Sequence, residues 1–174
     1  MAHESAMTRK ILGLMAAALI APLPASAMEV IHGEILQGWV LPDGNRMAAI
    51  RMTVEPGWKT YWRAPGDMGI PPSFDWSGSR NLSAVAVEWP APTVFREPNL
   101  TTIGYKDQVV LPLRISVPDK GAPVTVQTTI DLGVCSDICV PASLELPKGD
   151  VPPVPIQRLP PHWRSARFRR KRPV

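Results

Sequence analysis

Hydrophobic and polar positions alternate along this chain in short runs that proline and glycine separate. Apolar side chains occupy every second position from residue 48 to 54, within the run 46–54, which is the spacing of a strand with one buried face. A second β-rich run, residues 34–40, precedes it across the turn sequence of residues 42–45. The two runs therefore predict a β-hairpin.

Further short runs rich in β-branched residues follow, and no long stretch has the spacing of an amphipathic helix. These runs are residues 83–89, 108–117, 124–132 and 143–146. Several short strands separated by turn residues are typical of two antiparallel sheets packed face to face. We therefore predict an all-β fold with the architecture of an antiparallel β-sandwich.

Residues 57–78 form a long segment dense in aromatic residues, proline and glycine, which we expect to be a loop. Trp58, Trp62 and Trp76 lie in it. Tryptophan supplies large contact area at recognition surfaces, but the three rings could equally cover the edge of a small sandwich. Both interpretations stay open at this point.

The first 27 residues have the pattern of a secretory signal peptide. Arg9 and Lys10 precede an apolar run from 11 to 23, and Ala25 and Ala27 form a small-residue cleavage site. The run of 13 residues is shorter than the ~20 apolar residues of a spanning helix. We expect cleavage after Ala27, a periplasmic location, and no direct insertion of the remaining chain into the membrane.

Charge divides the rest of the chain into a domain, residues 28–150, and a tail, residues 151–174. The formal net charge of +4 comes from arginines near the C-terminus, since residues 28–157 hold 10 basic and 14 acidic residues. The tail is rich in proline and arginine, which predicts a disordered segment, and we interpret the abrupt change as a remnant of a longer protein. A mildly acidic exported domain argues against nucleic acid as a partner.

Cys135 and Cys139 are the chain's two cysteines, with three residues between them. If they face each other across a tight hairpin or one helical turn, their Cα atoms can approach the ~4.4–6.8 Å that a disulfide needs. Such a short bridge restricts the unfolded chain by only ~2 kcal/mol, so it is a weak staple. A close pair can also switch between dithiol and disulfide, as thiol exchange requires. Spacing alone supports both roles.

Metal binding is the weakest interpretation of the cysteines. Structural zinc usually takes four Cys or His ligands, and after residue 27 the chain adds only His32 and His162. Soft thiolates also suit Cu(I), with Met47, Met52 and Met68 as further ligands, although methionines in strands are more often core residues. We therefore predict no metal and no cofactor.

An ordered set of motifs resembles a known family. The motifs are residues 57–63, 69–76, 89–92, 103–105, 109–113 and 133–141. Together they are similar to the N-terminal periplasmic domain of the thiol-disulfide interchange protein DsbD, in the version found in suppressor of copper sensitivity protein B. The resemblance covers about residues 34–146, and the cysteines are closer together than in the best-known DsbD domains.

This resemblance implies an immunoglobulin-like sandwich and a thiol-disulfide oxidoreductase of the protein-disulfide reductase type. Cys135 and Cys139 match the catalytic pair, which takes electrons from a membrane-embedded thiol reductase and passes them to oxidised thioredoxin-like periplasmic proteins. A cap loop that shields the pair corresponds to about residues 95–105, with Phe95 as the shielding ring and Tyr105 at its end. Tyr61 matches an aromatic residue near the site.

The family's order also implies that Cys139 bonds the partner and that Cys135 resolves the mixed disulfide. Asp137 lies between them, and the loop holds no cation, so we expect both thiols to ionise reluctantly. The alternative function is a non-catalytic β-sandwich that binds a protein partner or copper, in which the disulfide is a structural clip.

Overall fold

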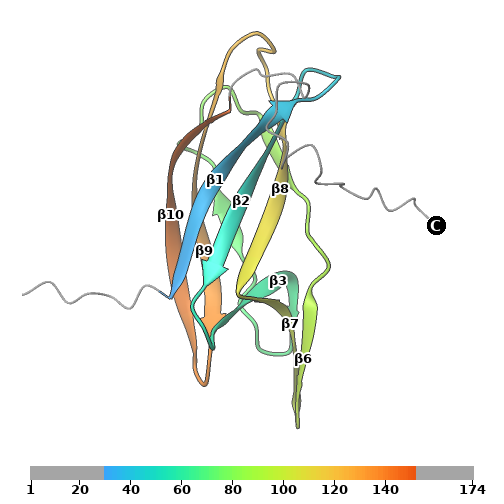
Figure 1. Cartoon of the computed structure of the whole chain (residues 1–174), viewed down its shortest axis with the longest axis vertical. Coiled ribbons are helices and arrows are strands. Elements are labelled where there is room, and N and C mark those ends of the chain that lie inside the picture. The colour runs from blue at the N-terminus through green and yellow to red at the C-terminus, as the bar shows by residue number, and fades with distance from the viewer. Residues whose placement is uncertain (1–29, 152–174) are drawn as a thin grey trace, which may run out of the picture.

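The computed structural model describes residues 30–151, and Figure 1 shows them as an elongated sandwich of strands. The expected signal peptide and the Arg-rich tail beyond Val151 lie outside the described residues. Between residues 30 and 151, no helix has the length and apolarity to cross a membrane.

The described part of the chain is built from strands. These are β1 (Ile31–Val40), β2 (Arg46–Val54), β3 (Lys59–Gly66), β4 (Ser73–Asp75), β5 (Ala84–Val87), β6 (Thr93–Glu97), β7 (Leu100–Lys106), β8 (Gln108–Ser116), β9 (Val124–Cys135) and β10 (Cys139–Val151). The predicted hairpin is confirmed as β1 and β2, and the predicted runs in the second half of the chain appear in β5, β8, β9 and β10.

The strands form two antiparallel sheets. One has the order β1-β2-β8-β5, and the other has the order β10-β9-β3-β7-β6, with β4 paired to β9. The predicted antiparallel β-sandwich of immunoglobulin-like type is confirmed.

The core lies between the sheets and follows the alternation of the sequence. On β9 every second side chain from Val124 to Val134 faces this core, and all of them are at most 2% exposed. On the other sheet Ile50, Leu111 and Leu113 are fully buried. Side chains at the odd positions of β9 consequently point to the outer face of the six-stranded sheet, which is where the cysteines lie.

The expectation of a loop over residues 57–78 was wrong, because β3 and β4 lie within it. Trp58, Trp62 and Trp76 are partly buried against the core, as the edge-covering interpretation holds. The predicted cap loop is also mostly strand, since β6 and β7 form a hairpin there. On β3 the neighbouring side chains of Thr60 and Tyr61 are both buried, so this strand lacks a clean alternation of period two.

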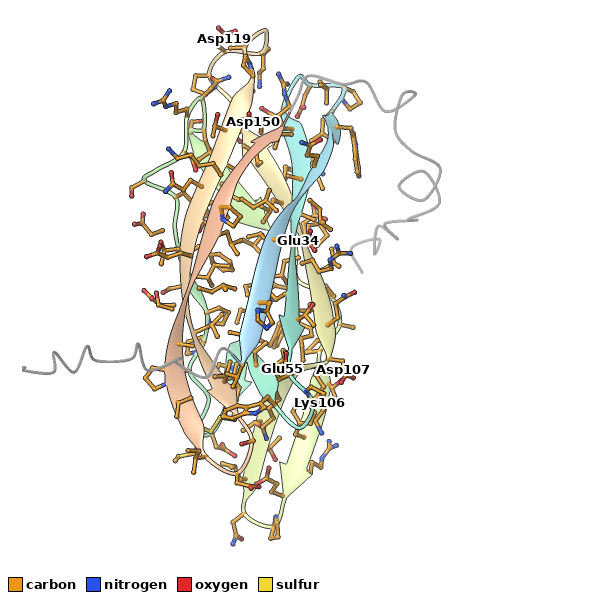
Figure 2. All side chains as sticks on the ribbon, turned by 60° about the vertical axis from the view of Figure 1, so that its left-hand side comes forward. Glu34, Glu55, Lys106, Asp107, Asp119 and Asp150 are labelled. Atoms are coloured by element: carbon orange, nitrogen blue, oxygen red, sulfur yellow. A yellow bond between two sulfur atoms is a disulfide. The ribbon has the colours of Figure 1, made fainter. Side chains whose placement is uncertain are left out.

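The two ends of the sandwich differ. The β9–β10 and β6–β7 hairpins project at the same end, the bottom of Figure 1. Figure 2 shows Asp119 and Asp150 at the other end, where Arg46 is fully buried and donates hydrogen bonds to the carbonyl oxygens of Lys120 and Ala122 at 2.8 and 3.3 Å. That end is fixed by Arg46, and the cysteines lie at the opposite one.

Candidate functional site

Cys135 ends β9 and Cys139 begins β10, and the two residues face each other in the register of the hairpin. Their sulfur atoms form a disulfide, and their Cα atoms are 4.1 Å apart. The Ser136 amide donates a hydrogen bond to the Ile138 carbonyl at 3.0 Å, which closes the loop between them. The expected position across the tip of a tight hairpin is confirmed.

The two cysteines differ in exposure. Cys135 is 0% exposed, whereas Cys139 belongs to the exposed residues of the hairpin tip. An attacking thiolate from another protein can therefore reach the Cys139 sulfur more readily than the Cys135 sulfur.

Tyr61 of β3 lies beneath the disulfide. Its ring is 1% exposed, and its hydroxyl is 2.5 Å from the Cys135 Sγ and 3.1 Å from the Cys139 Sγ. A disulfide sulfur carries no proton, so the hydroxyl is the donor. Burial raises the pKa of Tyr61, and the charge of Glu97 raises it further. The hydroxyl therefore keeps its proton at physiological pH.

Gly69 and Gly133 leave the space that the Tyr61 ring occupies. A Cβ on Gly69 would lie 2.7 Å from the Tyr61 Cδ1, and a Cβ on Gly133 would lie 3.0 Å from its Cδ2. The Gly133 amide also donates to the Ile70 carbonyl at 3.3 Å. A side chain at either glycine would displace the ring, so both glycines set the distance between the hydroxyl and the sulfurs.

Lys59 lies on the strand next to Cys135, and its ammonium group forms an ion pair with Glu97. It pairs with Cys135 across β3 and β9, so its side chain starts on the same face of the sheet. Its Nζ is 3.3 Å from the Glu97 Oε1 and 3.3 Å from the Thr102 Oγ1, and its side chain is only 12% exposed. The loop between the cysteines itself holds no cation, as the sequence shows, and the reluctant ionisation of the two thiols remains a prediction.

Phe95 lies on the β6–β7 hairpin and is partly buried. The Nζ atoms of Lys59 and Lys106 lie 5.1 and 5.2 Å from its ring centroid, within the range of cation–π contacts. Lys59 thus connects the cap hairpin to the strand that carries Cys135. The shielding role of Phe95 remains a prediction.

Tyr105 points to the other face of the sheet. It is 6% exposed within the hydrophobic core, and its hydroxyl donates to the Pro90 carbonyl at 2.9 Å. Burial raises the pKa of Tyr105 to about 12. Its expected part in recognition remains a prediction.

The candidate metal ligands do not come together. Met47 and Met52 are buried in two different clusters, and Met68 is 70% exposed. His32 lies 3.4 Å from Glu55, and His162 is outside the described residues. Within residues 30–151, no group of three or more His, Cys, Asp or Glu side chains could hold a metal ion.

Comparison with known proteins places the described domain in a family and finds similar solved structures. Residues 32–148 match the family described as thiol:disulfide interchange protein DsbD, N-terminal. The crystal structure of the N-terminal periplasmic domain of ScsB from Proteus mirabilis is similar at 26% identity with a TM-score of 0.53, and the match covers 71% of this chain and 48% of that one. The chain thus spans about half of that structure.

A structure from the AAF fimbriae of enteroaggregative Escherichia coli also matches, at 12% identity with a TM-score of 0.34, and it covers 70% of this chain and 99% of that one. This likeness is too low to carry an argument. Among curated proteins none matches.

Proposed function

We propose, because this chain belongs to the family of the DsbD N-terminal domain, that it passes electrons from a membrane-embedded thiol reductase to oxidised thioredoxin-like periplasmic proteins. Family and disulfide support a thiol-disulfide exchange module. The resemblance found in the sequence motifs is confirmed by the family match. The route of the electrons is our proposal, and its site is the Cys135–Cys139 pair.

The observation that carries the proposal is a disulfide at an exposed hairpin tip, with one sulfur accessible and one buried. A thiolate of the reductase attacks the Cys139 Sγ, the bond between the two sulfurs breaks, and its electron pair goes to the Cys135 Sγ. The second thiol of the reductase then attacks the mixed disulfide. The reductase leaves oxidised, and the pair is left as a dithiol.

Delivery of the electrons runs through the same atoms. The Cys139 thiolate attacks the disulfide of an oxidised partner and forms a mixed disulfide with one partner sulfur, while the other partner sulfur leaves as a thiolate. The Cys135 thiolate then attacks Cys139 Sγ, which re-forms the disulfide and releases the second partner sulfur. Two electrons pass to the partner, whose thiolates take up protons.

Tyr61 and Lys59 support both halves of this cycle in our proposal. The Tyr61 hydroxyl lies within reach of both sulfurs, so it can donate a hydrogen bond to whichever sulfur carries the negative charge. Lys59 adds a positive charge on the same face of the sheet. Phe95 and the hairpin that carries it would cover the pair until a partner docks.

We further propose that the protein acts in the periplasm. Domains of this family are periplasmic, and the N-terminal 27 residues have the pattern of an export signal. That compartment also holds partners with disulfides.

Single-cysteine variants test the proposal. With an oxidised thioredoxin-like protein, Cys135→Ala should accumulate a mixed disulfide through Cys139, because the resolving thiol is absent. Cys139→Ala should accumulate none. Thermal melts of both variants serve as the control, since the short bridge contributes only ~2 kcal/mol. A complex that forms only on Cys135 would reverse the roles, and loss of the cooperative melt would favour the structural clip.

A further inference from the structure

An open groove of about 370 Å³ lies beside the disulfide. Its lining is mainly apolar and includes Ile70, Pro71, Leu132, Pro141 and Ala142. The volume falls within the ~300–1,000 Å³ of ligand-binding clefts. The groove is therefore large enough to receive a side chain of another molecule.

The groove and the disulfide share one face of the sheet. Pro141 is two residues beyond Cys139 on β10, and it pairs with Gly133 of β9. Alternate residues of a strand point to the same side and are about 7 Å apart. The groove thus begins at Pro141, two positions along β10 from the residue with the accessible sulfur. Ile70 forms one wall of the groove, and its carbonyl accepts a hydrogen bond from the Gly133 amide.

Two exposed apolar side chains flank this region, Ile70 in the groove and Ile138 beside Cys139. Within the described residues, the exposed large hydrophobic side chains are Met68 (70%), Ile70 (39%), Val94 (41%) and Ile138 (65%). Ile138 precedes Cys139, and Ile70 lines the groove, two residues after Met68. Val94 lies on β6. Exposed apolar side chains beside a reactive group are typical of a protein-binding surface.

We propose that this groove binds the extended segment beside the reactive cysteine of the redox partner and selects an apolar side chain two residues from that cysteine. The inference rests on the proposed exchange function, since exchange places the partner's sulfur at Cys139. In an extended segment the side chain two residues away points to the same side and lies about 7 Å along. That spacing matches the step from Cys139 to Pro141.

The far end of the groove adds a second selection. Asp131 and Ser143 line it, and the Ser143 hydroxyl donates to the Asp131 Oδ1 at 2.7 Å. A carboxylate there disfavours an acidic side chain on the bound segment. The preferred occupant is therefore an apolar, non-acidic segment.

Two peptides test the proposal on the reduced protein. Each carries its cysteine as a mixed disulfide with glutathione, one with the sequence Leu-Gly-Cys-Gly-Leu and the other with Ser in place of both leucines. Exchange oxidises the Cys135–Cys139 dithiol and releases the peptide thiol and glutathione. The leucine peptide should react about fivefold faster, because the groove covers part of a leucine side chain.

Substitutions in the groove test whether the faster reaction of the leucine peptide depends on the groove. Ile70→Glu should bring the ratio of the two rates close to one, and Val94→Glu, the matched loss of an exposed hydrophobic side chain elsewhere, should keep it. Ser143→Arg, at an exposed position of β10, should also lower the ratio and serves if Ile70→Glu does not fold. Equal rates for the two peptides in the parent protein would overturn the proposal, as would an unchanged ratio in a folded Ile70→Glu or Ser143→Arg variant.

A binding experiment separates failure of the groove from failure of the exchange function. The leucine peptide with Ser in place of Cys is titrated into the oxidised protein, and the amide chemical shifts of Leu132, Ala142 and Ser143 are followed. If neither glutathione peptide exchanges, the exchange function fails, and these shifts decide the groove alone. The control is the peptide Ser-Gly-Ser-Gly-Ser. Shift changes at the three amides that only the leucine peptide produces would support the groove, and unchanged shifts would refute it.

Discussion

Replacing Tyr61 with phenylalanine removes the hydroxyl that contacts both sulfurs and keeps the ring that Gly69 and Gly133 enclose. In the reduced protein this hydroxyl would donate to a thiolate. A hydrogen bond to a charged group contributes about 1.5–3 kcal/mol, and one pKa unit corresponds to 1.36 kcal/mol. Because the bond favours the charged form, its loss should raise the pKa of the reactive thiol by about 1–2 units.

The effect on rate is smaller than the effect on ionisation. The thiolate fraction at pH 7 should fall by about 10- to 100-fold, while the remaining thiolate becomes more nucleophilic with a Brønsted coefficient of about 0.4–0.5. Alkylation at pH 7 should therefore slow by about 3- to 10-fold. The oxidised variant should lose only about 1 kcal/mol of stability, the typical net contribution of one hydrogen bond.

The measurement is the rate of alkylation of the reduced protein by iodoacetamide between pH 5 and 10. Tyr105→Phe is the matched control, because its hydroxyl donates to the Pro90 carbonyl on the other face of the sheet. It should keep the parent's midpoint. An identical midpoint for Tyr61→Phe and the parent would refute the role of the Tyr61 hydroxyl.

Three further predictions concern the surroundings of the pair. Lys59→Met removes the ammonium group that pairs with Glu97 beside the strand of Cys135, so the thiol should be alkylated about threefold more slowly at low salt and this difference should shrink in ~1 M salt. Phe95→Ala should speed alkylation and cost less than the ~3–5 kcal/mol of a deleted core Phe; equal rates with a large drop in Tm would make Phe95 an ordinary core ring. The pKa of Tyr105 is about 12 in the folded protein against an ordinary 10.0, so this residue's contribution to stability is complete below pH 10 and is lost as the pH rises towards 12. Urea unfolding between pH 9 and 12 should show a smaller loss in Tyr105→Phe than in the parent, and the loss that remains is expected from Tyr61, whose pKa is also raised; an equal loss in the two proteins would refute the contribution of Tyr105.

Much of the fold follows from local patterns in the sequence. The β1–β2 hairpin could be predicted because apolar side chains alternate on β2 and a strong turn sequence precedes it. β3 could not, because Thr60 is buried on one face and Tyr61 on the other. A strand covered on both faces loses the period of two, and only the partner strands reveal it.

Some residues of the site could also be predicted from local sequence, and others could not. The cysteines and Tyr61 were found through local motifs, whereas Lys59 reaches Cys135 only through the pairing of β3 with β9, which lie far apart in the sequence. Gly133 gives a local signal, since it stands two residues before Cys135. Its contact with the Tyr61 ring again depends on strand order.

The central claim is that the Cys135–Cys139 pair is a working redox couple, and its reduction potential tests this most directly. The purified protein is equilibrated with glutathione or dithiothreitol buffers, and the oxidised fraction is measured. A working couple that exchanges electrons with periplasmic proteins predicts a value near −200 mV. A value below about −300 mV would mark an inert structural bridge and contradict the account.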